Sequence, residues 1–337
     1  MLLSVLMPSN RNLAESRKAI ETALAFCERR DALLIVSDNS GDPEKRQLLR
    51  KASRRLRYIQ PADDTPHTNL RTVLAAAETE FVLMMGDDDQ LFVSPKDQPL
   101  DLASLGPGCI GIRPLVAVAN SEGRVIRVKD FPILDETPGR RVMRYNNKAG
   151  GDNACYHSIF RRRPFADLIT FFLDQHPVKG GYCDWALTCV MFAYGKLPYD
   201  PGVVFKYNYH QWDSTEKLDG QRQAIYAAAN LPAETERFKL LLLYLDIAVL
   251  GLRRGSPLGE AGKRSLLEEA GRPILNGFLK TIFDERQLCD ARTVELAQAM
   301  KTADTSDQFE LALEMLDCLQ PGLTERYCAF HRAAMEG

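Results

Sequence analysis

Apolar and polar residues alternate in blocks along the first hundred residues, and these blocks predict strands and helices in turn. Short apolar runs closed by proline, glycine or turn residues are typical of buried strands. They lie at 2–8, at 32–42 with the closing turn, at 57–60 and at 81–85. Segments between them have apolar residues at helical spacing, and these predict helices over 12–30, 43–56 and 69–80.

This alternation predicts four βα units and therefore a mostly parallel sheet covered by helices on both faces. Ligands of such sheets bind at the carboxyl ends of the strands. Polar residues follow each predicted strand and should converge on one crevice. They are Ser9, Asn10, Ser37, Asp38, Asn39, Asp63, Asp64, Asp87, Asp88 and Asp89.

The pattern changes beyond residue 100. Shorter strand-like runs and one predicted helix at 183–195 fill the region to residue 212, and leucine-rich helical windows follow to the end. We therefore expect a mixed α/β domain over 1–212, followed by an α-helical domain over 213–337.

Composition narrows the range of functions. The formal net charge is -2 over 337 residues, so no strong overall charge attracts nucleic acid or an anionic membrane. The eight cysteines include no C-x-x-C pair, as expected of reduced thiols in the cytoplasm. The apolar start of the chain lacks the basic region of a signal peptide. The longest apolar run, 240–252, contains Asp246 and falls short of the about 20 residues that cross a bilayer. It predicts a buried helix and leaves a peripheral membrane contact open.

The run "FVLMMGDDDQL" at 81–91 ends an apolar strand on three aspartates. Adjacent carboxylates repel unless a cation lies among them. Asp87 and Asp89 should point to one side and Asp88 to the other. Such a pair suits Mg²⁺ or Mn²⁺, which binds one or two carboxylates together with substrate phosphates. We expect the positive charge to come from outside, while a helix cap or solvated turn is the simpler alternative.

Four stretches resemble, in this order, the motifs of family 2 glycosyltransferases with the GT-A fold. They are "LLSVLMPSNRN", "LLIVSDNSGD", "HTNLRTVLAAAETEFVLMMGDDDQL" and "CDWALTCVMFAYGKLPYDPGVVFKYNYH". The resemblance covers 1–212, is strongest over 1–92 and is absent beyond. It implies a GT-A domain with a nucleotide-binding half at 1–100 and an acceptor half at 101–212. It also implies a nucleotide-diphosphate sugar donor, UDP by default, a divalent cation (Mn²⁺ or Mg²⁺) and inversion at the sugar carbon.

The resemblance also assigns site residues. Contacts to the nucleotide sugar are implied for Pro8, Asn10, Asp38, Asp63 or its neighbour Asp64, Asn69, Arg71, Asp87, Asp88 and Asn153. Asp89 is implied as the direct metal ligand. Asp87 shares the metal or the ribose, and His210 completes the metal site. His157 is expected to be a packed residue.

An inverting transfer needs a base to deprotonate the acceptor hydroxyl. "GGYCDWAL" places Asp184 at a predicted helix start after Gly180 and Gly181. It resembles the acidic residue of the family, although Cys183 stands where the family more often has glutamate. We expect Asp184 to be the catalytic base. The alternative is that Asp184 only caps the helix.

Two other functions remain open. A sugar-phosphate nucleotidyltransferase usually has a glycine-rich phosphate loop with a lysine after its first strand, and "MPSNRNLAES" has neither. A non-catalytic GT-A-like module would bind a partner through the helical tail. For a hexosyltransferase of polysaccharide biosynthesis, the acceptor is a glycan, a lipid-linked saccharide or another hydroxyl. Stable nucleic-acid binding is not expected, and a homodimer through the C-terminal helices is left open.

Overall fold

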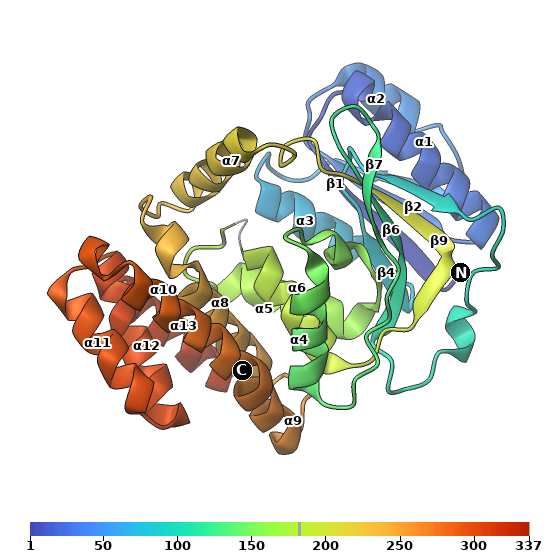
Figure 1. Cartoon of the computed structure of the whole chain (residues 1–337). Coiled ribbons are helices and arrows are strands. Elements are labelled where there is room, and N and C mark those ends of the chain that lie inside the picture. The colour runs from blue at the N-terminus through green and yellow to red at the C-terminus, as the bar shows by residue number, and fades with distance from the viewer. Residues whose placement is uncertain (181–182, 337) are drawn as a thin grey trace. The chain divides into compact units, whose positions relative to one another are not determined.

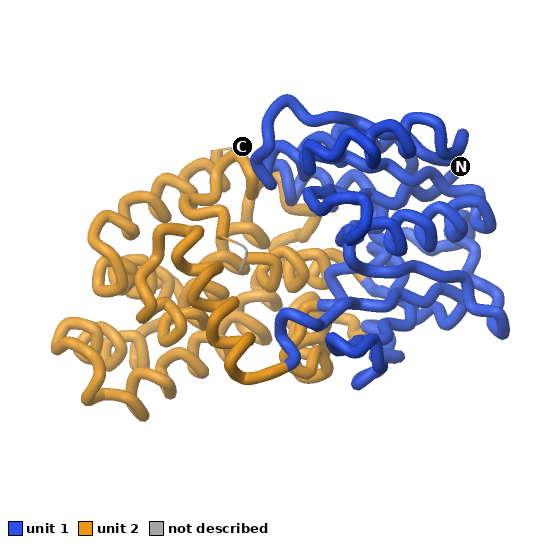
Figure 2. The backbone as a smooth tube through the Cα atoms, turned by 90° about the horizontal axis from the view of Figure 1, so that it is seen from above, with its two compact units in different colours: residues 1–134, 154–170, 196–213 blue, residues 135–153, 171–195, 214–337 orange. Residues whose placement is uncertain are grey.

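The computed structural model describes residues 1–180 and 183–336, which fall into two compact units. Unit 1 contains residues 1–134, 154–170 and 196–213, and unit 2 contains residues 135–153, 171–195 and 214–337 (Figure 2). The chain thus passes between the units several times before residue 214.

Unit 1 holds a nine-stranded sheet (Figure 1). Its strands are β1 (Leu3–Ser9), β2 (Leu33–Asp38), β3 (Leu56–Ile59), β4 (Phe81–Met84), β5 (Gln90–Val93), β6 (Gly111–Ala119), β7 (Val125–Lys129), β8 (Ile159–Arg161) and β9 (Tyr199–Asn208). They run in the order β3-β2-β1-β4-β8-β6-β9-β5, and β7 pairs with β6. The first four strands are parallel, whereas β8 is antiparallel to β4 and β6.

Helices cover both faces of the parallel strands. Unit 1 contains α1 (Leu13–Arg30), α2 (Pro43–Leu49), α3 (Pro66–Ala76) and the start of α5 (Arg162–Gln175). Leu3, Val5 and Met7 of β1 are buried in one core with Ile20 and Phe26 of α1. Burying such side chains contributes about 1.5–3 kcal/mol each. The opposite face is covered by α3, which packs on β1 and β2 (Figure 1). This packing holds the strand ends of unit 1 in register.

The regular secondary structure in the described part of unit 2 is helical. In chain order its helices are α4 (Pro138–Ala149), the end of α5, α6 (Asp184–Tyr194), α7 (Thr215–Ala228), α8 (Thr235–Leu252), α9 (Glu260–Ser265), α10 (Arg272–Asp284), α11 (Ala291–Thr302), α12 (Thr305–Leu319) and α13 (Leu323–Glu336). The central helix is α8, which packs against α6, α10, α12 and α13. As predicted, residues 240–252 lie in this buried helix. None of the helices in 1–180 and 183–336 combines the length and apolarity that a membrane span needs.

The predicted fold class, a mixed α/β sheet flanked by helices with a helical C-terminal region, is confirmed. Two predicted helices have wrong boundaries: α2 ends at Leu49 rather than near residue 56, and α3 spans Pro66–Ala76 rather than 69–80. A turn from Ser53 to Leu56 then starts β3, because Leu56 pairs with Leu34 of β2. Sheet pairing therefore outweighs the helical spacing of the arginines in this segment.

Candidate functional site

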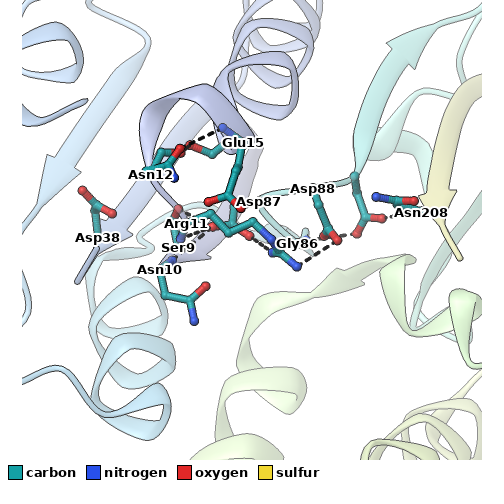
Figure 3. A network of polar contacts seen from close by, with 12 residues as sticks. Ser9, Asn10, Arg11, Asn12, Glu15, Asp38, Gly86, Asp87, Asp88 and Asn208 are labelled. Atoms are coloured by element: carbon teal, nitrogen blue, oxygen red, sulfur yellow. Dashed lines mark hydrogen bonds and ion pairs between the residues drawn. The ribbon is translucent and has the colours of Figure 1, made fainter. Parts of the chain in front are cut away.

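The carboxyl ends of β1, β2 and β4 lie side by side and bring the predicted polar residues together. Met7 pairs with Val36, Ser9 pairs with Asp38, and Leu6 pairs with Met84. The loop after β4 therefore carries its aspartates to the loop after β1 (Figure 3). This is the edge at which ligands bind in sheets of this kind.

Asp87 is buried, and its carboxylate accepts hydrogen bonds from four donor groups. Its Oδ2 accepts from Ser9 Oγ at 2.7 Å, from the Asn10 N–H at 3.1 Å and from the Arg11 N–H at 3.0 Å. Its Oδ1 accepts from Nη1 of Arg11 in an ion pair. Burial raises the pKa of Asp87, but these hydrogen bonds and the Arg11 charge outweigh it and leave the pKa lowered. Asp87 is therefore a stable carboxylate.

Arg11 supplies positive charge from within the chain to two of the aspartates, whereas the expected external cation stays a prediction. Its Nη2 lies 3.0 Å from Asp88 Oδ2, and its Nη1 binds Asp87. Burial lowers the pKa of Arg11, but the charges of Asp88 and Asp87 more than offset this and raise it. Asp88 does not point away from the network, because it shares Arg11 with Asp87.

Asp89 differs from Asp87 because no side-chain cation pairs with it at close range among the described residues. Its Oδ1 accepts from the Asn208 N–H at 2.8 Å and its Oδ2 from the Gly86 N–H at 3.2 Å. Nε2 of His157 lies 3.9 Å from Oδ2. Burial and the charge of Asp88 raise the pKa of Asp89 well above 3.8. A cation at this carboxylate would relieve the cost of burying its charge.

A second buried ion pair joins the ends of β1 and β2. Lys45 is fully buried, and its Nζ lies 2.8 Å from Asp38 Oδ1, 2.6 Å from Ser9 Oγ and 2.7 Å from the Arg11 carbonyl. Asp38, predicted to hold the nucleotide, is thus already bound to a lysine of the chain. The contact positions Ser9 and Arg11, which in turn bind Asp87.

The asparagines at this edge also hold the backbone. Asn69 Nδ2 donates to the Ser9 carbonyl at 3.0 Å and to Asn39 Oδ1 at 3.3 Å. Asn39 Nδ2 donates to the Asp64 carbonyl at 2.7 Å. Asn69, a predicted nucleotide contact, therefore also ties the end of β1 to the loop after β2.

The other predicted contacts of unit 1 lie on β1, in the loops that follow the strands and on α3. Pro8 lies in β1, and the Asn10 side chain is exposed beside the network. Asp63 is exposed and accepts from the Thr65 N–H at 2.9 Å in the turn before α3. Arg71 is half-buried on α3. Nδ1 of His210 lies 4.0 Å from Asp88 Oδ2 and thus beside Asp88 rather than Asp87.

Asp184 and Asn153 belong to unit 2, so their relation to the aspartates of unit 1 stays a prediction. Asp184 is the first residue of α6 and is partly exposed. Burial raises its pKa to about 7, against the lowering effects of the Asn153 side chain and the Trp185 N–H. The Tyr145 hydroxyl in turn donates to Asn153 Oδ1. A carboxyl with this pKa suits a base near neutral pH. Gly181, which belongs to the motif before Asp184, lies outside the described residues.

A divalent cation fits part of the predicted ligand set. Both oxygens of Asp87 are engaged by donors, including Arg11, so Asp87 is a poor ligand while that ion pair holds. Each oxygen of Asp89 accepts a single N–H in the hydrogen bonds above, and a carboxylate oxygen has two lone pairs. Asp89 and its neighbour Asp88 are the carboxylates that fit a hard cation.

Sequence reasoning missed Arg11 and Lys45. The available signal for Arg11 was a basic residue two positions after a strand end, in the loop where anionic groups were predicted. For Lys45, the signal was a lysine in the first turn of a helix, where the helix dipole disfavours a cation without a partner.

No family model and no curated protein matches the chain. Among solved structures, it is similar to that of S. aureus TarS 1-349, with 14% identity, 99% of this chain and 89% of that chain covered, and a TM-score of 0.47. The structure of S. aureus TarS 1-349 with UDP-GlcNAc gives 14% identity, the same coverage and a TM-score of 0.49. That of S. aureus TarS 1-349 with UDP gives 16% identity, 98% and 88% coverage, and a TM-score of 0.46.

Proposed function

We propose that the protein is an inverting glycosyltransferase that uses a nucleotide-diphosphate sugar, with UDP as the expected nucleotide. The observation that carries the proposal is the cluster at the ends of β1 and β4. There one arginine lies against two aspartates beside a third, buried carboxylate of raised pKa. A guanidinium and an under-neutralised carboxylate are together suited to a diphosphate that arrives with a divalent cation.

Each group has a proposed role in donor binding. The Arg11 side chain is 29% exposed, so its guanidinium can turn from Asp88 to a diphosphate oxygen. A divalent cation held by Asp88 and Asp89 would, when bound, stabilise the negative charge of the departing diphosphate. Asp87 keeps Arg11 and the loop after β1 in place through its four hydrogen bonds.

Asp184 is the proposed base. As the acceptor oxygen forms its bond to the anomeric carbon, its proton passes to the Asp184 carboxylate. The bond from that carbon to the diphosphate oxygen breaks, and the nucleoside diphosphate leaves with the electron pair. Attack opposite the leaving group inverts the anomeric centre. Asp184 then returns the proton to water. A pKa of about 7 lets it accept and release this proton near neutral pH.

The proposal is tested by thermal unfolding with UDP, GDP and dTDP and their sugars, each with and without Mn²⁺ or Mg²⁺. A donor at a hundred times its Kd should stabilise the folded state by about 2.7 kcal/mol. The matched control is Asp89→Asn, which keeps the shape of the side chain and should remove the metal-dependent part of the shift. If no nucleoside diphosphate or sugar donor shifts the Tm of the wild type, the proposal fails and a non-catalytic module is favoured.

A further inference from the structure

A single carboxylate is buried in α8, the long apolar helix of unit 2. Asp246 lies on α8 among leucines and is 1% exposed. A buried carboxylate strongly destabilises a fold unless donors satisfy it. Asp246 therefore needs hydrogen-bond donors from the elements that pack against α8.

Two donors from distant parts of the chain meet Asp246 Oδ1. Nε2 of His176, the residue after α5, lies 3.0 Å away, and the Tyr327 hydroxyl of α13 donates at 3.0 Å. Phe172 and Phe330 pack on the imidazole, with ring centroids 4.7 and 5.0 Å away. In this apolar enclosure the hydrogen bonds are stronger than they would be in water.

The other nitrogen of His176 holds a turn of the backbone. The N–H groups of Val178 and Lys179 donate to Nδ1 at 3.3 and 2.9 Å. Lys179 has a φ of 46°, a left-handed conformation that costs energy in a residue with a side chain. Because Nδ1 accepts, the ring proton must be on Nε2, which donates it to Asp246. The imidazole therefore joins the turn to α8.

The same tautomer argues against a metal ion. His176, Cys183 and Asp246 are the group of three ligand-type side chains within the described residues whose atoms lie within 4.8 Å of one another. A metal needs the lone pair of Nε2, and a ligating histidine donates its other N–H to an acceptor. Here Nε2 carries the proton and Nδ1 faces two donors.

Cys183, the residue before the proposed base, contacts both His176 and Gly180. Sγ of Cys183 lies 3.8 Å from Nε2 of His176, and the Cys183 N–H donates to the Gly180 carbonyl at 3.0 Å. Cys183 is 1% exposed, precedes Asp184 and makes no side-chain cap for α6. The far end of α6 is held by Arg141 of α4, whose Nε donates to the Phe192 carbonyl at 2.9 Å. The start of α6 has its buried anchor in the His176 turn.

We propose that His176, Asp246 and Tyr327 form a positioning cluster, which fixes the His176 turn and thereby the location of the Asp184 carboxylate. The link to catalysis rests on the proposed function, whereas the anchoring of the turn does not. None of the three residues is assigned contact with a substrate.

Alkylation of Cys183, followed by peptide mass spectrometry, measures the anchoring directly. Asp246→Ala would leave two buried donors unpaired and is avoided because it endangers folding. Tyr327→Phe keeps the ring and removes one hydrogen bond to Asp246. The matched control, Tyr226→Phe, removes a tyrosine–carboxylate hydrogen bond of 2.8 Å to Glu236 elsewhere in unit 2. Tyr327→Phe should speed Cys183 alkylation roughly tenfold over the control, because local opening becomes easier. Equal rates in the two variants overturn the proposal.

A second variant distinguishes the roles of the two imidazole nitrogens of His176. His176→Gln keeps a donor near Asp246 but removes the acceptor of the two turn N–H groups, so Cys183 alkylation should again accelerate. Zinc bound at one equivalent in the purified wild type, and lost in this variant, would contradict the assigned tautomer and overturn the proposal.

The catalytic consequence has its own measurement. In Tyr327→Phe the kcat of transfer should fall about threefold to tenfold while the KM for the donor stays within twofold, because the donor residues are untouched. Faster alkylation with an unchanged kcat overturns the positioning role. A wild type that binds no donor refutes the proposed function instead, and the alkylation rates still decide whether the cluster anchors the turn.

Discussion

Nη2 of Arg11 lies 3.0 Å from Oδ2 of Asp88, and the other terminal nitrogen of the same guanidinium binds Asp87. One arginine thus pairs with two of three consecutive carboxylates. Nε2 of His157 lies 3.9 Å from the third, Asp89, whose pKa is raised well above 3.8. Under the proposed function, Arg11 would bind the anionic diphosphate and Asp89 would bind the cation.

Removal of the Arg11 charge should weaken donor binding. Arg11→Gln is expected to raise the Kd of a nucleoside diphosphate in Mn²⁺ about tenfold to a hundredfold, the usual value of a charge-assisted hydrogen bond to phosphate. Titration calorimetry measures it. Arg17→Gln is the control, because Arg17 is an exposed residue of α1 whose ion-pair distance to Glu44 is 3.9 Å. An Arg11 variant that binds as tightly as this control would remove Arg11 from the donor site.

Loss of the Lys45 charge should lower the free energy of unfolding. Lys45→Met leaves Asp38 buried without its ion-pair partner, which typically destabilises the fold by about 3–5 kcal/mol. Urea unfolding measures the change. Lys51→Met, at an exposed position, should stay within about 0.5 kcal/mol of the wild type. Adding Asp38→Asn to Lys45→Met should recover part of the loss. A loss no larger than that of Lys51→Met would show that the buried pair does not stabilise the strand ends.

The pH dependence of transfer should report Asp184. Burial raises the pKa of this carboxyl to about 7, so it is protonated and inactive as a base below that pH. The kcat should therefore fall about tenfold for each unit below pH 7 and level off above it. Asp184→Asn should lower kcat by a factor of about a hundred or more while donor binding persists. A kcat that is flat from pH 5 to 8, or an active Asp184→Asn variant, would contradict the role of base.

Asp89 should make the empty protein less stable as the pH rises. Its folded-state pKa is raised well above 3.8 by burial and by Asp88, so the folded state holds the proton more tightly than the unfolded chain does. The resulting stability is complete below pH 3.8 and is lost as the pH rises through the folded-state pKa. Asp89→Asn has no such proton to lose, so the Tm of the variant relative to that of the wild type should increase as the pH rises from 3.8 through the folded-state pKa of Asp89. A Tm difference independent of pH would show that Asp89 is already neutralised.

The parallel half of the sheet could be predicted from the sequence, because its strands are continuous apolar runs. It also placed the aspartates at the right strand ends, since the carboxyl ends of parallel strands share an edge. The ion pairs could not be foreseen. Arg11 meets Asp87 only because β4 lies beside β1, an order that apolar spacing does not encode. The contact of His176 with Asp246 likewise joins residues 70 positions apart through helix packing.

The most direct test of the account is calorimetric titration of UDP and UDP-sugars into the wild type, Arg11→Gln and Asp89→Asn in the presence of Mn²⁺. The account predicts saturable binding at one site per chain in the wild type, weaker binding in Arg11→Gln and loss of the Mn²⁺-dependent part in Asp89→Asn. Equal binding in all three proteins would contradict a donor site at the ends of β1 and β4.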